Sequence, residues 1–326
     1  MIETIENAKQ VRMLEIFFRS LRGENISVKN LANQYRVSTK SISRDISDLK
    51  VFFADHRDLV GNTELEYSYH DKCYHLFMDD FLTDRELFAL AKVIVGARAF
   101  SKEELLTVID KLKKFSTVTD RAKINELLQK ELYHYVEIKH DCESVEDNLW
   151  RLANYITANK EITISYYRMD RVYTKYRLKL ASLMFADHYF YLIAFRTDGK
   201  VDTPYYYRVD RIKHITEHRD RVLDNRKLCF DEGLLRERSL FMWPGKLRTI
   251  QFEFWGPSVQ AMLDKLPNAK IIDRRDGKYI IEAVVYGDGI KMWLLSQGDW
   301  LKVTAPQEFV DEMKETIGKM GRIYNA

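Results

Sequence analysis

The stretch VSTKSISRDISDLK, residues 37–50, decides the fold of the first part of this chain. Its apolar residues Ile42, Ile46 and Leu49 follow the i, i+4, i+7 spacing that places side chains on one face of an α-helix. Ser38 comes just before this pattern, where a hydroxyl accepts a hydrogen bond from an amide of the first turn. The stretch therefore predicts a helix that begins at Thr39 and buries one face.

Two further apolar patterns precede this helix and supply the rest of a small core. One, over residues 28–35, follows a second capping serine, Ser27, and is separated from Ser38 by Arg36 and Val37. The other is a longer stripe that ends near Gly23 and consists of Val11, Leu14, Phe17, Phe18 and Leu21. Two capped helices across a tight turn, covered by a third, indicate a helix-turn-helix, whose second helix enters the major groove of DNA.

The opposite face of the predicted 39–50 helix is polar and basic. We expect the DNA contacts to come from Ser38, Thr39, Lys40, Ser43, Arg44 and Ser47. Between residues 27 and 50, five Lys and Arg side chains oppose two Asp side chains, a net charge of +3. An ordinary solvated helix face is the alternative, and this stretch alone leaves it open.

The run VSTKSISRDI, residues 37–46, resembles the pattern V-S-x-x-T-I-x-R-D-I/L of DeoR-like winged helix-turn-helix regulators, with Ser41 where those proteins usually have Thr. Residues 65–77, LEYSYHDKCYHLF, alternate around a polar turn and predict the hairpin that would be the wing. The resemblance implies that residues 1–80 are a winged helix-turn-helix domain that binds a double-stranded DNA operator. His70, Cys73 and His75 lack a fourth ligand nearby in the sequence, so no metal site is predicted.

Composition bounds the class of protein. The chain has 326 residues, of which 46% are hydrophobic, enough for two or three domains with cores of their own. Its 52 basic and 49 acidic residues exclude a uniformly basic coat, so contacts to DNA must come from local patches. The first residues lack the layout of a secretion signal, and no stretch approaches the roughly 20 apolar residues of a membrane span. We therefore expect a cytoplasmic protein without membrane contacts.

No motif for catalysis is found. The phosphate-cradling, nucleophile-elbow and zinc-protease patterns are absent from the sequence, and its three cysteines form no C-x-x-C pair. The sequence therefore predicts no catalytic residues, no cofactor and no disulfide framework. An enzyme acting on nucleotides is the alternative, for which Asp210 and His214 are the one tempting pair.

The middle of the chain changes from helices to strands. Residues 81–159 read as a helical linker with N-terminal caps at Thr83, Ser101 and Ser144. Residues 160–219 have strand-forming runs that predict a small antiparallel barrel or sheet. Those 60 residues contain 12 Lys or Arg, 7 Asp or Glu and 12 aromatic residues. Interleaved rings and cations suit a surface that stacks bases and holds phosphates, although a tyrosine-rich core is the competing interpretation.

Two motifs in this segment resemble the WYL domain. The triplet that names the family reads Phe190-Tyr191-Leu192 here, and YRVDRI, residues 207–212, matches its F-R-L/V-D-R-I. Phe190 replaces the family's Trp, and Leu180 stands where a Pro is common. The resemblance implies an Sm-like β-barrel that senses a nucleotide or nucleic-acid fragment. Its expected ligand-binding residues are Tyr191, Arg208 and Arg211, with Tyr166, Arg168 and Arg177 added from adjacent strands.

The C-terminal third follows a connector over residues 220–246. Residues 247–326 alternate strand and helix in a βαββαβ order, which predicts a ferredoxin-like sandwich with a trailing helix. The run LLSQGDWLKVTAPQEF, residues 294–309, is similar to the C-terminal extension that follows WYL domains in many regulators. The whole chain is thus expected to be an α+β multidomain protein.

These resemblances, in their order along the chain, imply a bacterial WYL-domain transcriptional regulator. We expect a homodimer, because two recognition helices about 34 Å apart address paired half-sites. The alternative is an adaptor that binds single-stranded DNA or RNA with its barrel and has no regulatory ligand.

Overall fold

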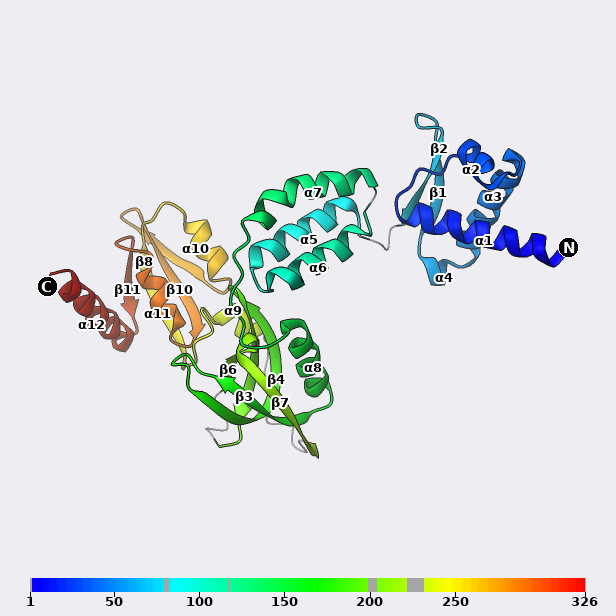
Figure 1. Cartoon of the computed structure of the whole chain (residues 1–326). Helices are drawn as coiled ribbons and strands as arrows, with labels where there is room; N and C mark the ends of the chain where they lie inside the picture. Colours follow the sequence, from blue (N-terminus) through cyan, green and yellow to red (C-terminus); the bar gives the residue numbers. More distant parts are fainter. Residues whose placement is uncertain (1, 79–81, 117, 199–203, 222–231, 326) are drawn as a thin grey trace. The chain divides into compact units, whose positions relative to one another are not determined.

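The computed structural model describes residues 2–78, 82–116, 118–198, 204–221 and 232–325 (Figure 1). The chain divides into two compact units, Met1–Ile138 and Lys139–Ala326. The first unit contains helices and one hairpin, and the second contains two larger sheets with helices packed on them. This mixture confirms the predicted α+β class of a chain with several domains.

The first elements of unit 1 include the two capped helices and the hairpin that residues 27–77 predicted, and a short helix that was not predicted. They are α1 (Ile2–Leu21), α2 (Val28–Tyr35), α3 (Thr39–Asp55), the short α4 (Arg57–Val60), β1 (Thr63–Ser68) and β2 (Cys73–Met78). The Ser38 hydroxyl accepts a hydrogen bond from the amide of Ser41 at 3.1 Å, so α3 begins where its cap predicted. The tight turn before it depends on Arg36, which adopts the left-handed conformation with φ of 54°.

The core of these elements is formed by the predicted faces of α2 and α3. Ile42, Ile46 and Leu49 are buried together with Leu31. The face of α1 that packs on them differs from the predicted stripe, because Ile16 is fully buried whereas Val11, Leu14 and Phe18 are exposed. β1 and β2 form an antiparallel hairpin, which an isolated bridge between Ile26 and Tyr74 ties to the helices.

Three helices complete unit 1. They are α5 (Asp84–Ala97), α6 (Lys102–Lys113) and α7 (Val118–Tyr133). Capping boxes begin α5 at Thr83 and α6 at Ser101, as predicted, because each cap hydroxyl and the glutamate three residues later satisfy amides reciprocally. Their core contains Ala91, Leu105 and Leu128.

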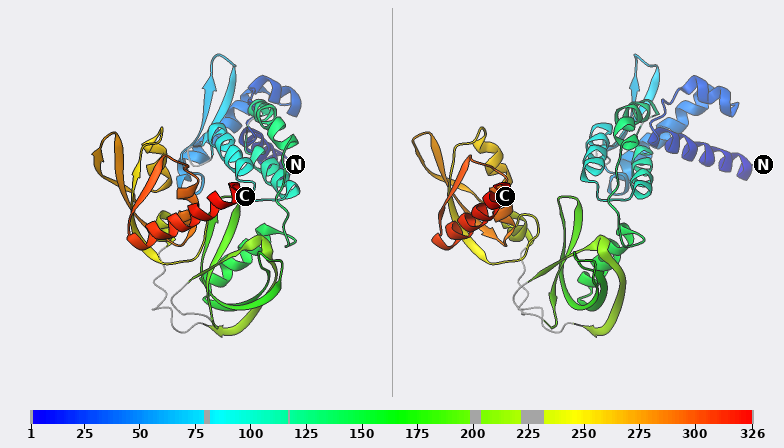
Figure 2. Two further views of the ribbon diagram at one scale, coloured as in Figure 1. Left: turned by 90° about the vertical axis from the view of Figure 1, so that its left-hand side faces the viewer. Right: turned by 60° about the vertical axis from the view of Figure 1, so that its left-hand side comes forward.

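The first part of unit 2 is a helix on a five-stranded sheet. Its elements are α8 (Val145–Thr157), β3 (Lys160–Tyr167), β4 (Tyr173–Ala186), β5 (Tyr189–Arg196), β6 (Tyr205–Arg208), the 3-10 turn η1 (Val209–Arg211) and β7 (Ile212–Arg221). The antiparallel order is β6-β5-β4-β3-β7. Figure 2 shows the sheet strongly curled. α8, which falls inside the predicted linker, packs against β3 and β4 and shares their core.

Residues 205–212 do not form one strand. β6 ends at Arg208, and η1 separates it from β7. Arg211 lies in this turn, so the alternation of side chains along β6 does not extend to it.

Residues on both faces of β5 are buried. Leu192 lies in the core under α8 with Leu152. Ile193 faces the other way and packs with Leu235 and Met242, which follow the sheet in the chain. The described part of the predicted connector, residues 232–246, therefore packs on the second face of the sheet.

The second part of unit 2 has the predicted βαββαβ order. Its elements are α9 (Glu232–Arg238), β8 (Leu247–Phe254), α10 (Val259–Lys265), β9 (Lys270–Arg275), β10 (Lys278–Tyr286), α11 (Gly289–Leu295), β11 (Leu301–Ala305) and α12 (Gln307–Tyr324). The four strands pair antiparallel in the order β11-β8-β10-β9. β10 lies between β8 and β9, which is the split βαβ arrangement of a ferredoxin-like sandwich.

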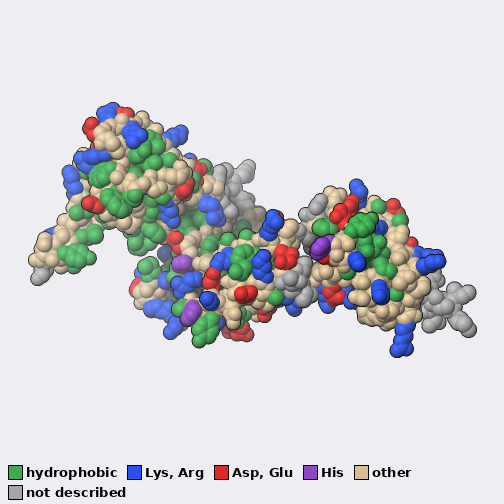
Figure 3. All heavy atoms as spheres, turned by 90° about the horizontal axis from the view of Figure 1, so that it is seen from above, with side chains coloured by type: hydrophobic (Ala, Val, Ile, Leu, Met, Phe, Trp, Pro, Cys, Tyr) green, Lys and Arg blue, Asp and Glu red, His purple; other side chains and the backbone are tan. Residues whose placement is uncertain are grey.

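The distribution of charge agrees with the nearly equal numbers of basic and acidic residues, 52 and 49. Basic and acidic side chains lie interspersed on the face shown in Figure 3. No helix within the described ranges is long and apolar enough to cross a bilayer. Cys73 and Cys142 are half-buried thiols, and Cys229 lies outside the described residues.

Candidate nucleic-acid interface and ligand site

The six side chains predicted to contact DNA are all exposed at the start of α3: Ser38, Thr39, Lys40, Ser43, Arg44 and Ser47. Lys40, Arg44 and Ser47 follow the spacing of one helix face, opposite the buried Ile42 and Ile46. The Ser38 hydroxyl is engaged in capping the helix. The start of α3 thus presents a polar, cationic surface on a capped helix.

Asp45 and Asp48 of this segment both pair with basic side chains of α1. Arg12 forms an ion pair of 2.5 Å with Asp45, whose side chain is 2% exposed. Lys9 pairs with Asp48 at 2.7 Å. The hydrogen bond with Asp45 raises the pKa of Arg12, although burial opposes this. Sequence reasoning counted both acids against the charge of the face and missed these pairs, because their partners lie more than 30 residues away.

The hairpin adds a second exposed polar group at its turn. His70 lies at the tip, with Nδ1 2.8 Å from Asp71 Oδ1. The hydrogen bond and charge of Asp71 raise the pKa of His70. His75 Nε2 lies 3.3 Å from the same carboxylate, so Asp71 links both histidines. Closer to the helices, Lys50 Nζ lies 5.0 Å from the ring centre of Tyr74.

The second candidate site is centred on Arg208 at the end of β6. Its Nε and Nη2 donate hydrogen bonds to the two oxygens of Asp210, at 3.0 and 2.6 Å. The guanidinium carbon lies 3.4 Å from the ring centre of Tyr189. Burial lowers the pKa of Arg208, but the hydrogen bond and charge of Asp210 outweigh this and raise it. The site thus holds a permanent cation between an anion and an aromatic face.

Tyr191 and Tyr166 approach Arg208 from two directions. Tyr191 lies directly opposite Arg208 in the pairing of β5 with β6. Burial raises the pKa of Tyr191 to about 12, so its hydroxyl stays a neutral donor at physiological pH. The Tyr166 hydroxyl accepts a hydrogen bond from the Arg208 amide at 3.2 Å, while the ring of Tyr166 is buried in the core. The core interpretation therefore holds for the Tyr166 ring.

The remaining three predicted arginines differ in their surroundings. Arg211 is half-buried and close enough to Tyr166 to lower that residue's pKa, which burial raises. Arg168 pairs with Asp170 at 3.1 Å, and Arg177 pairs with Glu161 at 2.9 Å. The structure therefore brings Tyr166, Tyr191, Arg208 and Arg211 into one neighbourhood, whereas Arg168 and Arg177 are engaged with carboxylates of their own.

Tyr189 and Asp210 are members of this site that sequence reasoning did not assign to it. The signal for Tyr189 is its spacing of two from Tyr191, which places both on one face of a strand. Asp210 is buried, and its backbone carbonyl accepts hydrogen bonds from the amides of Asp141 and Cys142 at 2.8 and 3.1 Å. His214, considered with Asp210 for catalysis, is exposed.

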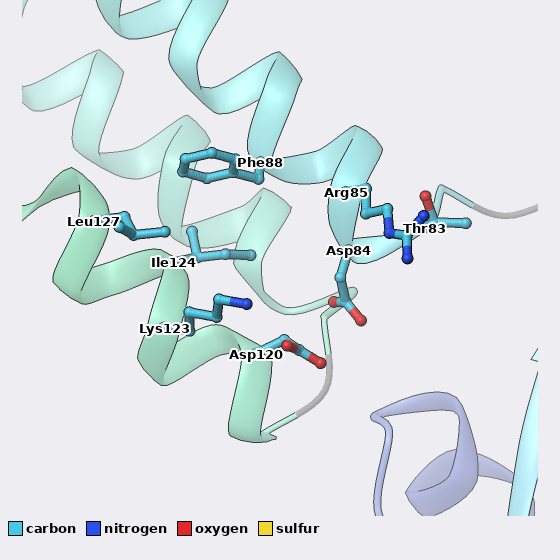
Figure 4. A pocket seen from close by; sticks show the side chains of 8 residues that line it. All are labelled: Thr83, Asp84, Arg85, Phe88, Asp120, Lys123, Ile124 and Leu127. Carbon is cyan, nitrogen blue, oxygen red and sulfur yellow. The ribbon is translucent and has the colours of Figure 1, made fainter.

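A cavity of about 680 Å³ lies between α5 and α7 (Figure 4). Phe88, Ile124 and Leu127 form its apolar lining, and Asp84 and Asp120 lie near the first turns of the two helices. None of the residues predicted to contact DNA or ligand lines it. The sequence did not predict this cavity.

Two protein-family models match this chain, and both matches lie in unit 2. Residues 147–217 match the model of the WYL domain, and residues 247–321 match that of the WCX domain. The chain therefore contains a WYL domain followed by a WCX domain. The first match includes all but the first two residues of α8, in agreement with the packing of that helix on the sheet. Residues 1–146 lie outside both matches, so the resemblance of residues 37–46 to DeoR-like regulators stays a prediction.

Two solved structures are similar to this chain at low identity. One is proteasome accessory factor B/C (PafBC) of Arthrobacter aurescens, at 13% identity and a TM-score of 0.31, over 98% of this chain and 49% of that one. The chain thus spans about half the length of PafBC. The other is a CRISPR Cas-related protein, at 15% identity and a TM-score of 0.39, over 76% and 75% of the two chains. A comparison with curated protein sequences gave no match.

Proposed function

We propose that the protein is a ligand-responsive, sequence-specific transcriptional regulator. In this proposal residues 1–80 act as a winged helix-turn-helix, with α3 in the major groove and the β1–β2 hairpin as the wing. The observation that carries the proposal is the charge on α3. Its acids at positions 45 and 48 pair with Arg12 and Lys9 of α1, and Lys40 and Arg44 are exposed.

The WYL domain is proposed to sense a nucleotide or nucleic-acid fragment, as an Sm-like barrel. Arg208 supports this, because its fork of donors and the Tyr189 ring suit a phosphate and a base. A phosphate would compete with Asp210 for the same two donors. Binding would then change the salt bridge that anchors η1, and with it the packing of residues 209–211.

A homodimer is part of the proposal. One recognition helix touches few phosphates, whereas two can address half-sites about 34 Å apart or a multiple of that distance. By thermodynamic reciprocity, a ligand that weakens DNA binding must bind less tightly to the DNA-bound protein.

The test of DNA binding replaces Lys40 and Arg44 by alanine, singly and together. We expect each change to weaken binding to operator DNA by about 1–3 kcal/mol if the lost contact is to a base, without lowering thermal stability, because both side chains are exposed. Fluorescence anisotropy with labelled duplex measures the affinity, after the operator has been mapped by sequencing genomic fragments that the protein retains.

Lys130→Ala on α7 is the matched control, since Lys130 is an exposed helical lysine and its loss changes net charge equally. We expect this control to bind duplex like the unmodified protein. Undiminished affinity in the Lys40→Ala/Arg44→Ala double variant would show that α3 is not the recognition helix.

A nucleic-acid-binding adaptor is the second candidate. A further cation between rings favours it, since the Arg196 guanidinium lies 4.7 and 5.4 Å from the ring centres of Tyr176 and Tyr205. Such a surface binds single strands without needing an allosteric response.

A further inference from the structure

The chain that connects unit 1 to α8, residues 139–144, is bonded to the turn that follows Arg208. These residues are the joining segment. The backbone carbonyl of Asp210 accepts hydrogen bonds from the amides of Asp141 and Cys142, at 2.8 and 3.1 Å. The backbone of the joining segment is therefore held by η1.

A second contact fixes the same segment through a side chain. The two carboxylate oxygens of Asp141 accept hydrogen bonds from both terminal nitrogens of Arg171, each at 2.9 Å. Arg171 lies between β3 and β4, in the left-handed conformation with φ of 63°. Two parallel bonds between a guanidinium and a carboxylate fix orientation as well as distance. Asp141 is thus held by its backbone and by its side chain.

Asp210 contacts both the proposed ligand site and the joining segment. Its carboxylate accepts the two bonds from Arg208 and its side chain is only 6% exposed, while its carbonyl binds the joining segment. A phosphate that took both donors of Arg208 would leave this buried carboxylate without its counterion, which is unfavourable. The carboxylate would then move toward water, and the carbonyl of the same short turn would move with it.

We propose that Asp210 and Asp141 form a coupling element, which transmits phosphate binding at Arg208 to the segment that connects the two units. In the ligand-free protein the turn holds the amides of residues 141 and 142, and a bound phosphate releases them. The inference rests on the proposed function for the nature of the ligand and for its effect on DNA. The link between Arg208 and the joining segment depends on neither.

Hydrogen–deuterium exchange of the full-length protein tests this link without ligand or DNA. Mass spectrometry reads the exchange of a peptide that covers residues 139–144. Arg208→Met leaves Asp210 unpaired, as a bound phosphate would, and we expect exchange of this peptide to become about tenfold faster, as loss of one hydrogen bond allows. Arg208→Lys keeps the charge and loses the fork, so it should give a smaller change in the same direction, and it replaces Arg208→Met if that variant does not fold.

Arg196→Met is the matched control for the exchange measurement. Arg196 binds the carboxylate two residues later, Asp198, with the same fork at 2.8 and 2.7 Å, whereas the amides of the joining segment donate to Asp210. This variant should exchange like the unmodified protein over residues 139–144. Unchanged exchange in both Arg208 variants, or an acceleration as large in Arg196→Met, would overturn the proposal.

A 5′-phosphorylated single-stranded DNA trimer tests the direction of coupling. Because coupling is reciprocal, a contact that holds the joining segment in place must weaken phosphate binding. Asp141→Ala removes the bond with Arg171, so we expect it to bind the trimer about fivefold more tightly, a usual size for such coupling. Glu143→Ala is the control, since Glu143 is exposed in the same segment and its loss changes net charge equally. Fluorescence anisotropy measures both affinities.

The outcomes separate this inference from the proposed function. Trimer affinity that rises equally in Asp141→Ala and Glu143→Ala, or in neither, would overturn the coupling. Trimer binding that leaves duplex affinity unchanged, together with faster exchange in Arg208→Met, would contradict the regulatory function and support the link. If no trimer binds, the ligand assigned by the proposed function is wrong, and the exchange result alone decides the link.

Discussion

Single residues of one helix have opposite roles that their types do not reveal. Arg44 and Asp45 are neighbours in α3, yet Arg44 is exposed and Asp45 is buried against Arg12. The reason is the helical period, which turns adjacent side chains about 100° apart and so directs one to solvent and the other to α1. Asp45 therefore fixes the position of α3 and does not itself belong to the exposed face proposed to contact DNA.

Removing Asp45 tests this role at the residue scale. We expect Asp45→Ala to destabilise the protein by about 3–5 kcal/mol, since it leaves a mostly buried guanidinium unpaired. Urea unfolding monitored by circular dichroism measures the change. The double variant Arg12→Met/Asp45→Leu should recover most of the loss, because apolar groups of similar size replace the pair. A single variant as stable as the unmodified protein would show that the pair is dispensable.

At the scale of elements, α8 decides where the WYL domain begins. Its Leu152 is fully buried with Leu178 and Leu192 of the sheet, and the Asn148 side chain donates to the Ile212 carbonyl at 3.1 Å. The helix thus closes the core and holds the start of β7 next to η1. The helix also contacts η1, the turn that carries Asp210 and Arg211, and so helps to position it.

Truncation of Leu152 tests the contribution of α8. We expect Leu152→Ala to cost about 2–5 kcal/mol, because it leaves a cavity in a fully buried site. Trp150→Ala is the control, since Trp150 is 71% exposed on the same helix and its loss should change stability little. The free energy of unfolding is measured by denaturant titration, followed by the tyrosine fluorescence of the protein. Equal losses in the two variants would contradict the packing of α8.

At the scale of the whole molecule, the two proposed functions differ in one property. In the regulator, ligand binding changes the affinity for DNA, whereas in the adaptor it does not. Removing Arg208 alone would leave the buried Asp210 unpaired, so the variant should neutralise both. Tyr191→Phe is a gentler change that removes one hydroxyl.

For Arg208→Met/Asp210→Asn and for Tyr191→Phe, we expect duplex affinity of the free protein to be unchanged. Short single-stranded DNA oligonucleotides should alter the duplex affinity of the unmodified protein and have a smaller effect on the variants. Anisotropy titrations with and without oligonucleotide measure this. Oligonucleotide binding that leaves duplex affinity unchanged in the unmodified protein would favour the adaptor.

The sequence by itself determined the elements whose signals are local. Cap residues and apolar periodicity located α2, α3, α5 and α6, and the strand-helix order of residues 247–326 predicted the C-terminal sandwich. These succeed because a cap, a helix face and a hairpin depend on residues within about one or two turns of each other.

Tertiary structure alone decided which polar groups are partnered. The pairing of Asp45 with Arg12 and the packing of Leu235 of α9 on Ile193 of the sheet both join residues more than 30 positions apart. Local sequence carries no signal for such contacts, because burial and electrostatic partners depend on which distant elements pack together.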